Sequence, residues 1–131
     1  MIEHSRAEAP LECCGVLGGK DRLASSIHRF RNIAASETRF EADPQAIIRA
    51  VQELRARGEE FVAIYHSHPR WRAIPSKTDL ERNGYGDLPQ IIVSLLDDPA
   101  EVRAWRLDPE SYVEIPLVIV GPDVVPQGGD R

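Results

Sequence analysis

The segment from Phe61 to Asp79 constrains the fold of this 131-residue chain more than any other stretch. It opens with a short apolar, mostly β-favouring run over residues 61–65, which predicts a buried strand. His66 and His68 follow at the end of that run, and Pro69 ends the strand. Histidines two positions apart on an extended segment can both face one cation.

A second local signal lies at Ser76 and Asp79. Pro75 disfavours helix at the residue before it and Ser76 is a favourable N-cap, so a helix is expected to begin here with Asp79 in its first turn. Asp79 lies eleven residues after His68 and can supply a third ligand. Three ligands with an open position are typical of a catalytic zinc site. The same residues also fit commoner roles, as polar loop histidines and a plain helix cap.

This arrangement resembles the JAMM motif of the MPN domain family, in which His-x-His is followed after seven residues by Ser and after two more by Asp. The chain matches every fixed position. The family also requires an upstream glutamate, which spacing alone does not select from 21 acidic residues. Residues 10–19 resemble the stretch that carries it in bacterial and archaeal members, with Glu12 in the required place. A surface or helix-terminal carboxylate is the other interpretation of Glu12.

The resemblance implies an α/β protein with the MPN (JAMM, cytidine-deaminase-like) fold, a curved mixed β-sheet flanked by helices. Asp43 as N-cap and Pro44 at the first helical position predict a helix that ends at Gly58. The strand over residues 91–96 is expected beside the histidine strand. The other expected elements are a short helix over residues 3–11 and strands over residues 23–30, 102–107 and 112–120.

Composition sets limits on domain organisation and function. A chain of 131 residues with 42% hydrophobic content suits one compact domain, expected over residues 1–120, with a Gly- and Pro-rich flexible tail over 121–131. The net charge of -5 argues against a nucleic-acid binder. No apolar run is long enough to span a bilayer, and residues 1–4 lack signal-peptide character, so a cytoplasmic protein is expected.

Gly128 and Gly129 in the tail resemble the unprocessed end of a ubiquitin-like protein, or are two glycines in a disordered segment.

Four further side chains are candidates for chemistry. Cys13 and Cys14 are the only cysteines, and two neighbouring thiols without a wider framework fit a reducing compartment. Cys14 could be a nucleophile, although the resemblance assigns the chemistry to metal and water. His4 and His28 are expected to be structural.

The resemblance implies a stand-alone bacterial or archaeal zinc metallopeptidase. One Zn²⁺ per chain, held by His66, His68 and Asp79, would bind a water and lower its pKa towards about 7. Glu12 would remove the proton of that water and pass it to the leaving amine. Ser76 would donate a hydrogen bond to the developing oxyanion. The expected reaction is hydrolysis of an amide.

The expected partner is a ubiquitin-like or sulfur-carrier protein with a C-terminal Gly-Gly, because family members cleave the peptide or isopeptide bond after that dipeptide. The chain is short for the insertions that hold a second, linked ubiquitin. Arg70, Trp71 and Arg72 form either a solvated loop or one wall of the groove for the partner's tail. Two other functions stay open: a catalytically idle MPN scaffold, and a zinc hydrolase or deaminase of small molecules.

Overall fold

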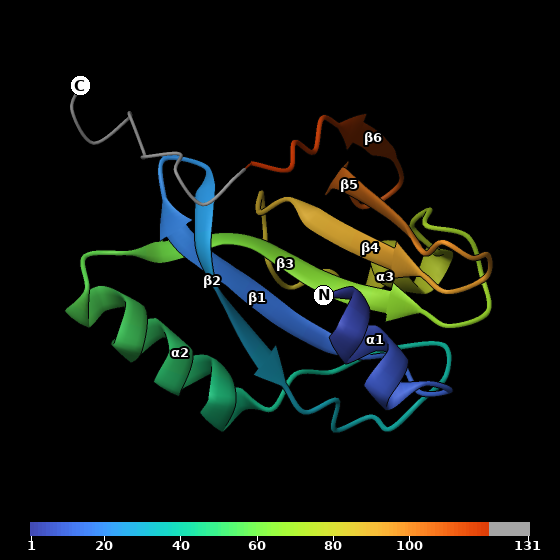
Figure 1. Ribbon diagram of the computed structural model, residues 1–131, viewed down its shortest axis with the longest axis horizontal. Coiled ribbons are helices and arrows are strands. Elements are labelled where there is room, and N and C mark those ends of the chain that lie inside the picture. Colours follow the sequence, from blue (N-terminus) through green and yellow to red (C-terminus); the bar gives the residue numbers. More distant parts are fainter. Residues whose placement is uncertain (121–131) are drawn as a thin grey trace.

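A computed structural model describes residues 1–120, and the expected tail at 121–131 lies outside the described residues. Within the described part, one six-stranded sheet packs against three helices (Figure 1). The elements in chain order are α1 (Ile2–Glu8), β1 (Cys14–Lys20), β2 (Leu23–Phe30), α2 (Pro44–Ala56), β3 (Glu60–His68), α3 (Lys77–Glu81), β4 (Gln90–Ser94), β5 (Glu101–Leu107) and β6 (Tyr112–Ile115).

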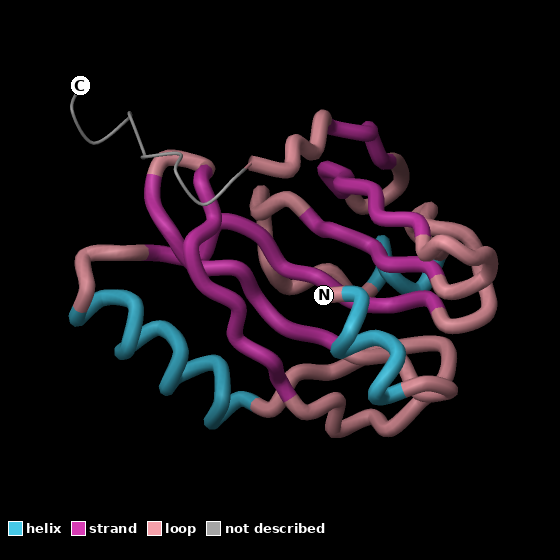
Figure 2. The backbone as a smooth tube through the Cα atoms, viewed as in Figure 1, coloured by secondary structure: helices cyan, strands magenta, loops and turns pink. Residues whose placement is uncertain are grey.

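The sheet has the strand order β2-β1-β3-β4-β5-β6. The pair β3–β4 is parallel and the other four pairs are antiparallel. The sheet is therefore mixed and β4 lies beside the histidine strand, which confirms both predictions. Figure 2 shows long loops gathered at the right-hand edge of the view, where β3 ends. Irregular segments from distant parts of the chain thus meet around the end of the strand that carries the two histidines.

The two faces of the sheet are covered by different helices. Ile64 on β3 packs in a cluster with the buried Ala50 of α2, whereas the next residue, Tyr65, faces α1 and bonds His4. Leu80 of α3 packs on residues of β4 and β5 that share the face of Ile64. Helices α2 and α3 therefore cover one face, and α1 covers the other (Figure 1).

Helix α2 begins as the sequence predicts. Pro44 is its first residue, and the Asp43 carboxylate accepts the N–H of Gln45 at 3.0 Å. The helix ends at Ala56, and Gly58 has a φ of +70°, a conformation that glycine adopts without steric cost. None of the helices within residues 1–120 is long and apolar enough to cross a membrane.

Helix α1 and strand β6 end earlier than the sequence predicted. Helix α1 ends at Glu8 instead of residue 11, because Pro10 disfavours helix at Ala9, whose ψ is 140°. Strand β6 ends at Ile115 instead of residue 120, because Pro116 has no N–H with which to continue the ladder.

Strand β4 also ends early. It covers Gln90–Ser94, whereas residues 91–96 were expected. The Ser94 hydroxyl accepts the N–H of Leu96 at 3.2 Å, so a side chain takes the donor that a longer strand would use. Strand β2 has the predicted bounds, and β5 begins one residue before the predicted start at 102.

Candidate metal centre and active site

His66 and His68 occupy the C-terminal end of β3 on the face that α2 and α3 cover. Both are buried, at 0% and 3% exposure. Ser67 between them points to the opposite face, where its hydroxyl accepts the N–H of Cys13 at 2.8 Å. The alternation of the strand therefore places both imidazoles on one side, as the sequence pattern predicted.

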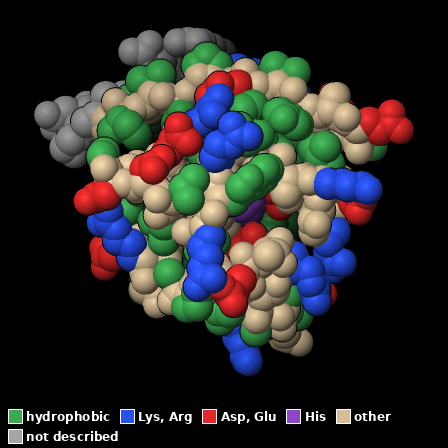
Figure 3. Space-filling model, turned by 90° about the vertical axis from the view of Figure 1, so that its right-hand side faces the viewer, with side chains coloured by type: hydrophobic (Ala, Val, Ile, Leu, Met, Phe, Trp, Pro, Cys, Tyr) green, Lys and Arg blue, Asp and Glu red, His purple; other side chains and the backbone are tan. Residues whose placement is uncertain are grey.

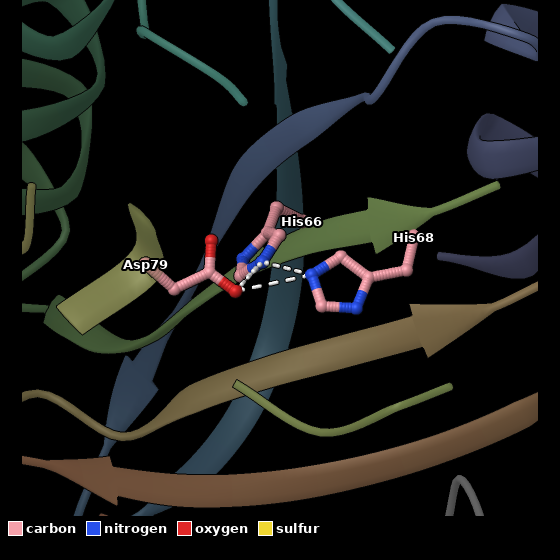
Figure 4. A group of neighbouring side chains, drawn as sticks. All are labelled: His66, His68 and Asp79. Carbon is pink, nitrogen blue, oxygen red and sulfur yellow. Dashed lines mark hydrogen bonds and ion pairs between the residues drawn. The ribbon is translucent and has the colours of Figure 1, made fainter. Parts of the chain in front are cut away.

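Asp79 reaches the histidines from the first turn of α3. Its backbone N–H donates to the Ser76 hydroxyl oxygen at 3.0 Å, and its carboxylate accepts the Ser76 N–H at 2.9 Å. This reciprocal pair is a capping box, and it confirms Ser76 as the N-cap of the helix. The two bonds fix the Asp79 carboxylate so that it points from α3 towards the end of β3 (Figure 4).

The three side chains converge on one point. Asp79 Oδ2 lies 3.1 Å from Nε2 of His66 and 3.0 Å from Nε2 of His68, and the two Nε2 atoms are 3.2 Å apart (Figure 4). The lone pairs on this oxygen and these two nitrogens repel one another at such distances unless a proton or a cation lies among them. A buried set of two imidazoles and one carboxylate therefore fits a metal ion.

The electrostatics keep Asp79 ionised. Burial alone would raise the pKa of this carboxyl, but the charge of His66 and hydrogen bonds from His66, His68 and the Ser76 N–H hold it well below its usual range. The ionised carboxylate is the form that binds a cation.

His68 is oriented by a second hydrogen bond. Its Nδ1 lies 2.7 Å from the carbonyl oxygen of Arg72. Because a carbonyl only accepts, Nδ1 carries a hydrogen, and Nε2 would be the ligand atom once a metal takes the place of its proton. His66 is held by packing, since the ring of Phe40 stacks on it with centroids 4.6 Å apart.

Glu12 approaches this cluster from the segment before β1 and is 3% exposed. Its N–H donates to the Ser36 carbonyl at 2.9 Å, and its own carbonyl accepts from the Asn32 amide at 3.0 Å. Within the described residues its Oε1 has no hydrogen-bond partner. Burial, and then the negative charge of Asp79, raise the pKa of Glu12 to about 9. A buried carboxyl with a raised pKa and a free oxygen is suited to proton transfer.

A cavity of about 570 Å³ opens beside the cluster. Figure 3 shows this face of the molecule, with a histidine side chain at the bottom of the hollow. The structure thus brings five of the predicted site residues to the lining of one cavity, while His66 and Asp79 lie behind it. The cavity is lined by Glu12, Glu37, Thr38, His68, Pro69, Arg70, Trp71, Ser76 and Thr78.

The three residues expected to contact a partner differ in their placement. Arg70 and Trp71 line the cavity, and the centroids of the Trp71 and His68 rings are 5.3 Å apart. The Arg70 guanidinium lies 3.7 Å from the carboxylate of Glu37 across the same cavity. Arg72 is not among the lining residues, and it contributes its backbone carbonyl to His68 instead.

Sequence reasoning did not single out Glu37, Thr38 or Asn32. The first two line the cavity from the loop between β2 and α2. Asn32 organises that loop, because its side-chain amide bonds Glu12 and three loop residues at the backbone. Its partners besides the Glu12 carbonyl are Arg39 O, Ala34 N and Glu41 N. No local sequence pattern indicates that a loop asparagine makes several hydrogen bonds to the backbone in this way.

The remaining candidates lie outside the metal cluster. His4 is buried and its Nδ1 lies 2.7 Å from the Tyr65 hydroxyl, and His28 lies on β2 beside Ser26. Both positions agree with the structural role expected for these histidines. Cys14 is fully buried, and burial raises the pKa of its thiol to about 12, which opposes a nucleophilic role.

The mixed sheet, the capped helix α3 and the buried His-His-Asp cluster, which could hold a metal ion, define an MPN-type domain. A family model described as "Prokaryotic homologs of the JAB domain" matches residues 1–108. JAB is another name for the MPN domain. The chain belongs to this family, which confirms the resemblance seen in the sequence.

Two relatives of similar length are a desampylase and a CysO-cysteine peptidase. A desampylase from Pyrococcus furiosus is 32% identical over 114 residues, which cover 86% of this chain and 79% of the relative. A CysO-cysteine peptidase from Mycobacterium tuberculosis is 32% identical over 124 residues, which cover 92% of this chain and 84% of the relative. A solution structure of a protein from Desulfitobacterium hafniense superposes with a TM-score of 0.82 at 28% identity, covering 90% of this chain and 84% of the other.

Proposed function

We propose that this protein is a zinc-dependent JAMM-type peptidase that hydrolyses the amide bond after the C-terminal Gly-Gly of a ubiquitin-like or sulfur-carrier protein. The observation that carries the proposal is the single cavity in which a buried carboxyl, Glu12, and a hydroxyl, Ser76, flank a buried metal-ligand set. The names of the relatives, a desampylase and a CysO-cysteine peptidase, support cleavage of protein conjugates.

His66, His68 and Asp79 would hold the metal. Two imidazole nitrogens and one carboxylate oxygen suit zinc, and three protein ligands leave room for a further one. When bound, zinc supplies Lewis acidity, which polarises an amide carbonyl and favours deprotonation of water. Cys13 and Cys14, both free and buried, fit the reducing cytoplasm as the setting.

Glu12 is the residue that moves the proton. Its Oε1 has no partner within the described chain, and the carboxyl faces the cavity rather than bulk solvent. Burial is the first cause of the raised pKa of Glu12 and the charge of Asp79 is the second, so a cation bound to Asp79 would lower this pKa from about 9. Glu12 can therefore accept a proton from water and return it to the leaving amine near neutral pH.

Ser76 stabilises the charge that develops on the substrate. Its hydroxyl oxygen already accepts the N–H of Asp79, so its own hydrogen is free to donate into the cavity. A donor in this place stabilises an oxyanion, a role worth about 10²–10³ in rate. The same side chain thus caps α3 and serves the reaction.

The cavity also suits the proposed substrate. Trp71 and Arg70 form one wall and Glu37 and Thr38 face them from another loop. A Gly-Gly tail has no side chains and can lie extended between such walls, while the globular part of its protein docks outside. Trp71 would stack on the tail and Arg70 would pair with its carbonyl or carboxylate oxygens, and we propose the same role for Arg72, which is exposed in the same loop.

The test combines metal analysis with turnover of a carrier protein that is extended by a few residues after Gly-Gly. The wild type should hold about one zinc per chain and release the extension, as read by mass spectrometry. Glu12→Gln should keep the fold and the zinc but lose nearly all turnover, because an amide cannot accept the proton. Glu41→Gln, which changes an exposed carboxylate in the loop between β2 and α2, should behave as the wild type.

Each negative result would contradict a different part of the proposal. Wild-type turnover in Glu12→Gln would place the general base elsewhere. Stoichiometric zinc in His66→Ala, His68→Ala and Asp79→Ala alike would reject the ligand set. A zinc-free and inactive wild type would indicate a scaffold, and turnover of small amides without turnover of carriers would indicate a small-molecule hydrolase.

A further inference from the structure

Three successive carbonyl groups in the loop between β3 and α3 are each bonded by a side chain. The loop joins His68 to Ser76, the N-cap of the helix that carries Asp79, so it links two of the candidate ligands. The bonds are Ser94 Oγ to Trp71 O, His68 Nδ1 to Arg72 O at 2.7 Å, and Trp105 Nε1 to Ala73 O at 2.9 Å. The middle donor is a candidate metal ligand, and the two outer donors come from β4 and β5.

The donors of the two outer bonds lie in the interior of the protein. Ser94 is 2% exposed, Trp105 is 5% exposed and Ala73 is fully buried. Loss of the Trp105 N–H leaves the Ala73 carbonyl without its partner in the interior, and loss of the Ser94 hydroxyl removes the side-chain donor to the half-buried Trp71 carbonyl. Because β4 and β5 belong to the sheet, these bonds anchor an irregular loop to the most rigid part of the fold.

The position of the Arg72 carbonyl depends on its neighbours. Trp71 and Ala73 are the residues on either side of it, and both are held by the outer bonds. The Arg72 carbonyl in turn fixes the Nδ1–H tautomer and the orientation of His68. Beyond Ala73 the same chain leads through Pro75 into α3 and Asp79.

We propose that Trp105 and Ser94 are positioning residues of the metal centre. They hold the loop against the sheet, so that the Arg72 carbonyl orients His68 and the chain enters α3 with Asp79 directed at the histidines. This inference rests on the metal site of the proposed function. It assigns a role in metal binding to two residues that contact none of the three ligand side chains by a hydrogen bond.

A purely structural role for Trp105 is the alternative, because its ring packs with Ile92 and Leu107 in the cluster under α3. The two roles differ in what they change. Packing alone affects the free energy of unfolding, whereas positioning also affects the affinity of the folded protein for metal. Outer partners of metal-binding histidines are typically worth about 10–100-fold in affinity.

The test measures zinc affinity of metal-free protein by competition with a chelating dye, beside urea unfolding. Trp105→Phe keeps an aromatic ring but removes the N–H, and Ser94→Ala removes the hydroxyl. Both should weaken zinc binding about 10-fold or more, and both should alter the visible absorption spectrum of the cobalt-substituted protein. Leu107→Ala, in the same cluster but without a bond to the loop, should lose stability and keep wild-type affinity and spectrum.

A second readout needs no metal. In the metal-free protein, the NMR signal of the His68 Nδ1 hydrogen should be protected from exchange in the wild type and in Leu107→Ala, and lost in both donor variants. If Trp105→Phe and Ser94→Ala bind zinc as the wild type does and keep this signal, the positioning role is overturned. If the wild type itself binds no zinc, the proposed function falls together with this inference.

Discussion

Gly15 shows what a single absent side chain does for the site. In the register of β1 and β3 it lies opposite Tyr65, the residue before His66. A Cβ at this position would lie 2.4 Å from the Tyr65 hydroxyl and 2.5 Å from the His28 carbonyl oxygen. The glycine therefore leaves the space in which the Tyr65 side chain lies and reaches His4 of α1.

Gly15→Ala should lower the free energy of unfolding by about 1–3 kcal/mol, because Tyr65 and the backbone of β2 must move to admit one methyl group. Urea unfolding at pH 7.5 measures the change. Gly84→Ala is the matched control, since a Cβ there meets no atom within 4 Å. Equal free energies of unfolding of the two variants would show that the strands around Gly15 can move apart without a loss of stability.

At the scale of elements, α1 is joined to the sheet by a buried hydrogen bond from a histidine. It has only seven residues, too few to be stable alone. His4 is its buried anchor, through the 2.7 Å bond to the Tyr65 hydroxyl. Burial, and then the positive charge of Arg29, lower the pKa of His4. The imidazole is therefore held neutral in the folded protein.

This lowered pKa predicts a loss of stability in acid. Well above pH 6.5 His4 is neutral in both the folded and the unfolded chain, so its contribution is fully present there. As the pH falls below that value the unfolded chain gains a proton that the folded chain does not bind. The free energy of unfolding should then decrease by up to about 1.4 kcal/mol per pH unit from this group.

His4→Gln should remove that part of the pH dependence and keep a side chain able to bond Tyr65. Urea unfolding of metal-free protein between pH 5 and pH 8 measures it, because metal release then has no part in the result. The stability gap between wild type and variant should change below pH 6.5 and stay constant above. Parallel curves over the whole range would contradict the lowered pKa.

At the scale of the whole molecule, the cavity is built by segments that are distant in the chain. Glu12 precedes β1, Thr38 lies between β2 and α2, and Trp71 lies between β3 and α3. The order of the central strands, with β1 beside β3, brings these segments to one end of the sheet. A partner that presents an extended tail to this cavity must therefore dock across several loops at once.

We expect cleavage to require glycine at the end of that tail. In a ubiquitin-like carrier extended by a few residues, Val in place of the last Gly should suppress release of the extension, because a branched side chain obstructs an approach between Trp71 and the opposite loop. Mass spectrometry of both carriers with wild-type enzyme, and with Glu12→Gln as the inactive control, gives the answer. Equal cleavage of both carriers, or scattered cuts in unfolded proteins, would indicate a general peptidase.

The sequence by itself determined the parts of the site that depend on local geometry. Strand alternation places His66 and His68 on one side, and the helix cap places Ser76 and Asp79 in one turn, so their spacing carried the prediction. Proline also explains, after the fact, where α1 and β6 stop. Glu12 was found through the family resemblance, because spacing alone did not distinguish it.

Only the tertiary structure decided which distant residues surround that site. Glu37 lines the cavity and Asn32 bonds the backbone of Glu12, both from a segment whose path no local pattern specifies. Trp105 and Ser94 bond the loop before α3, from strands that follow α3 in the chain. The side chains of such residues act through contacts between elements far apart in sequence. Those contacts follow from strand order and register, which the sheet as a whole establishes when both of its faces are buried.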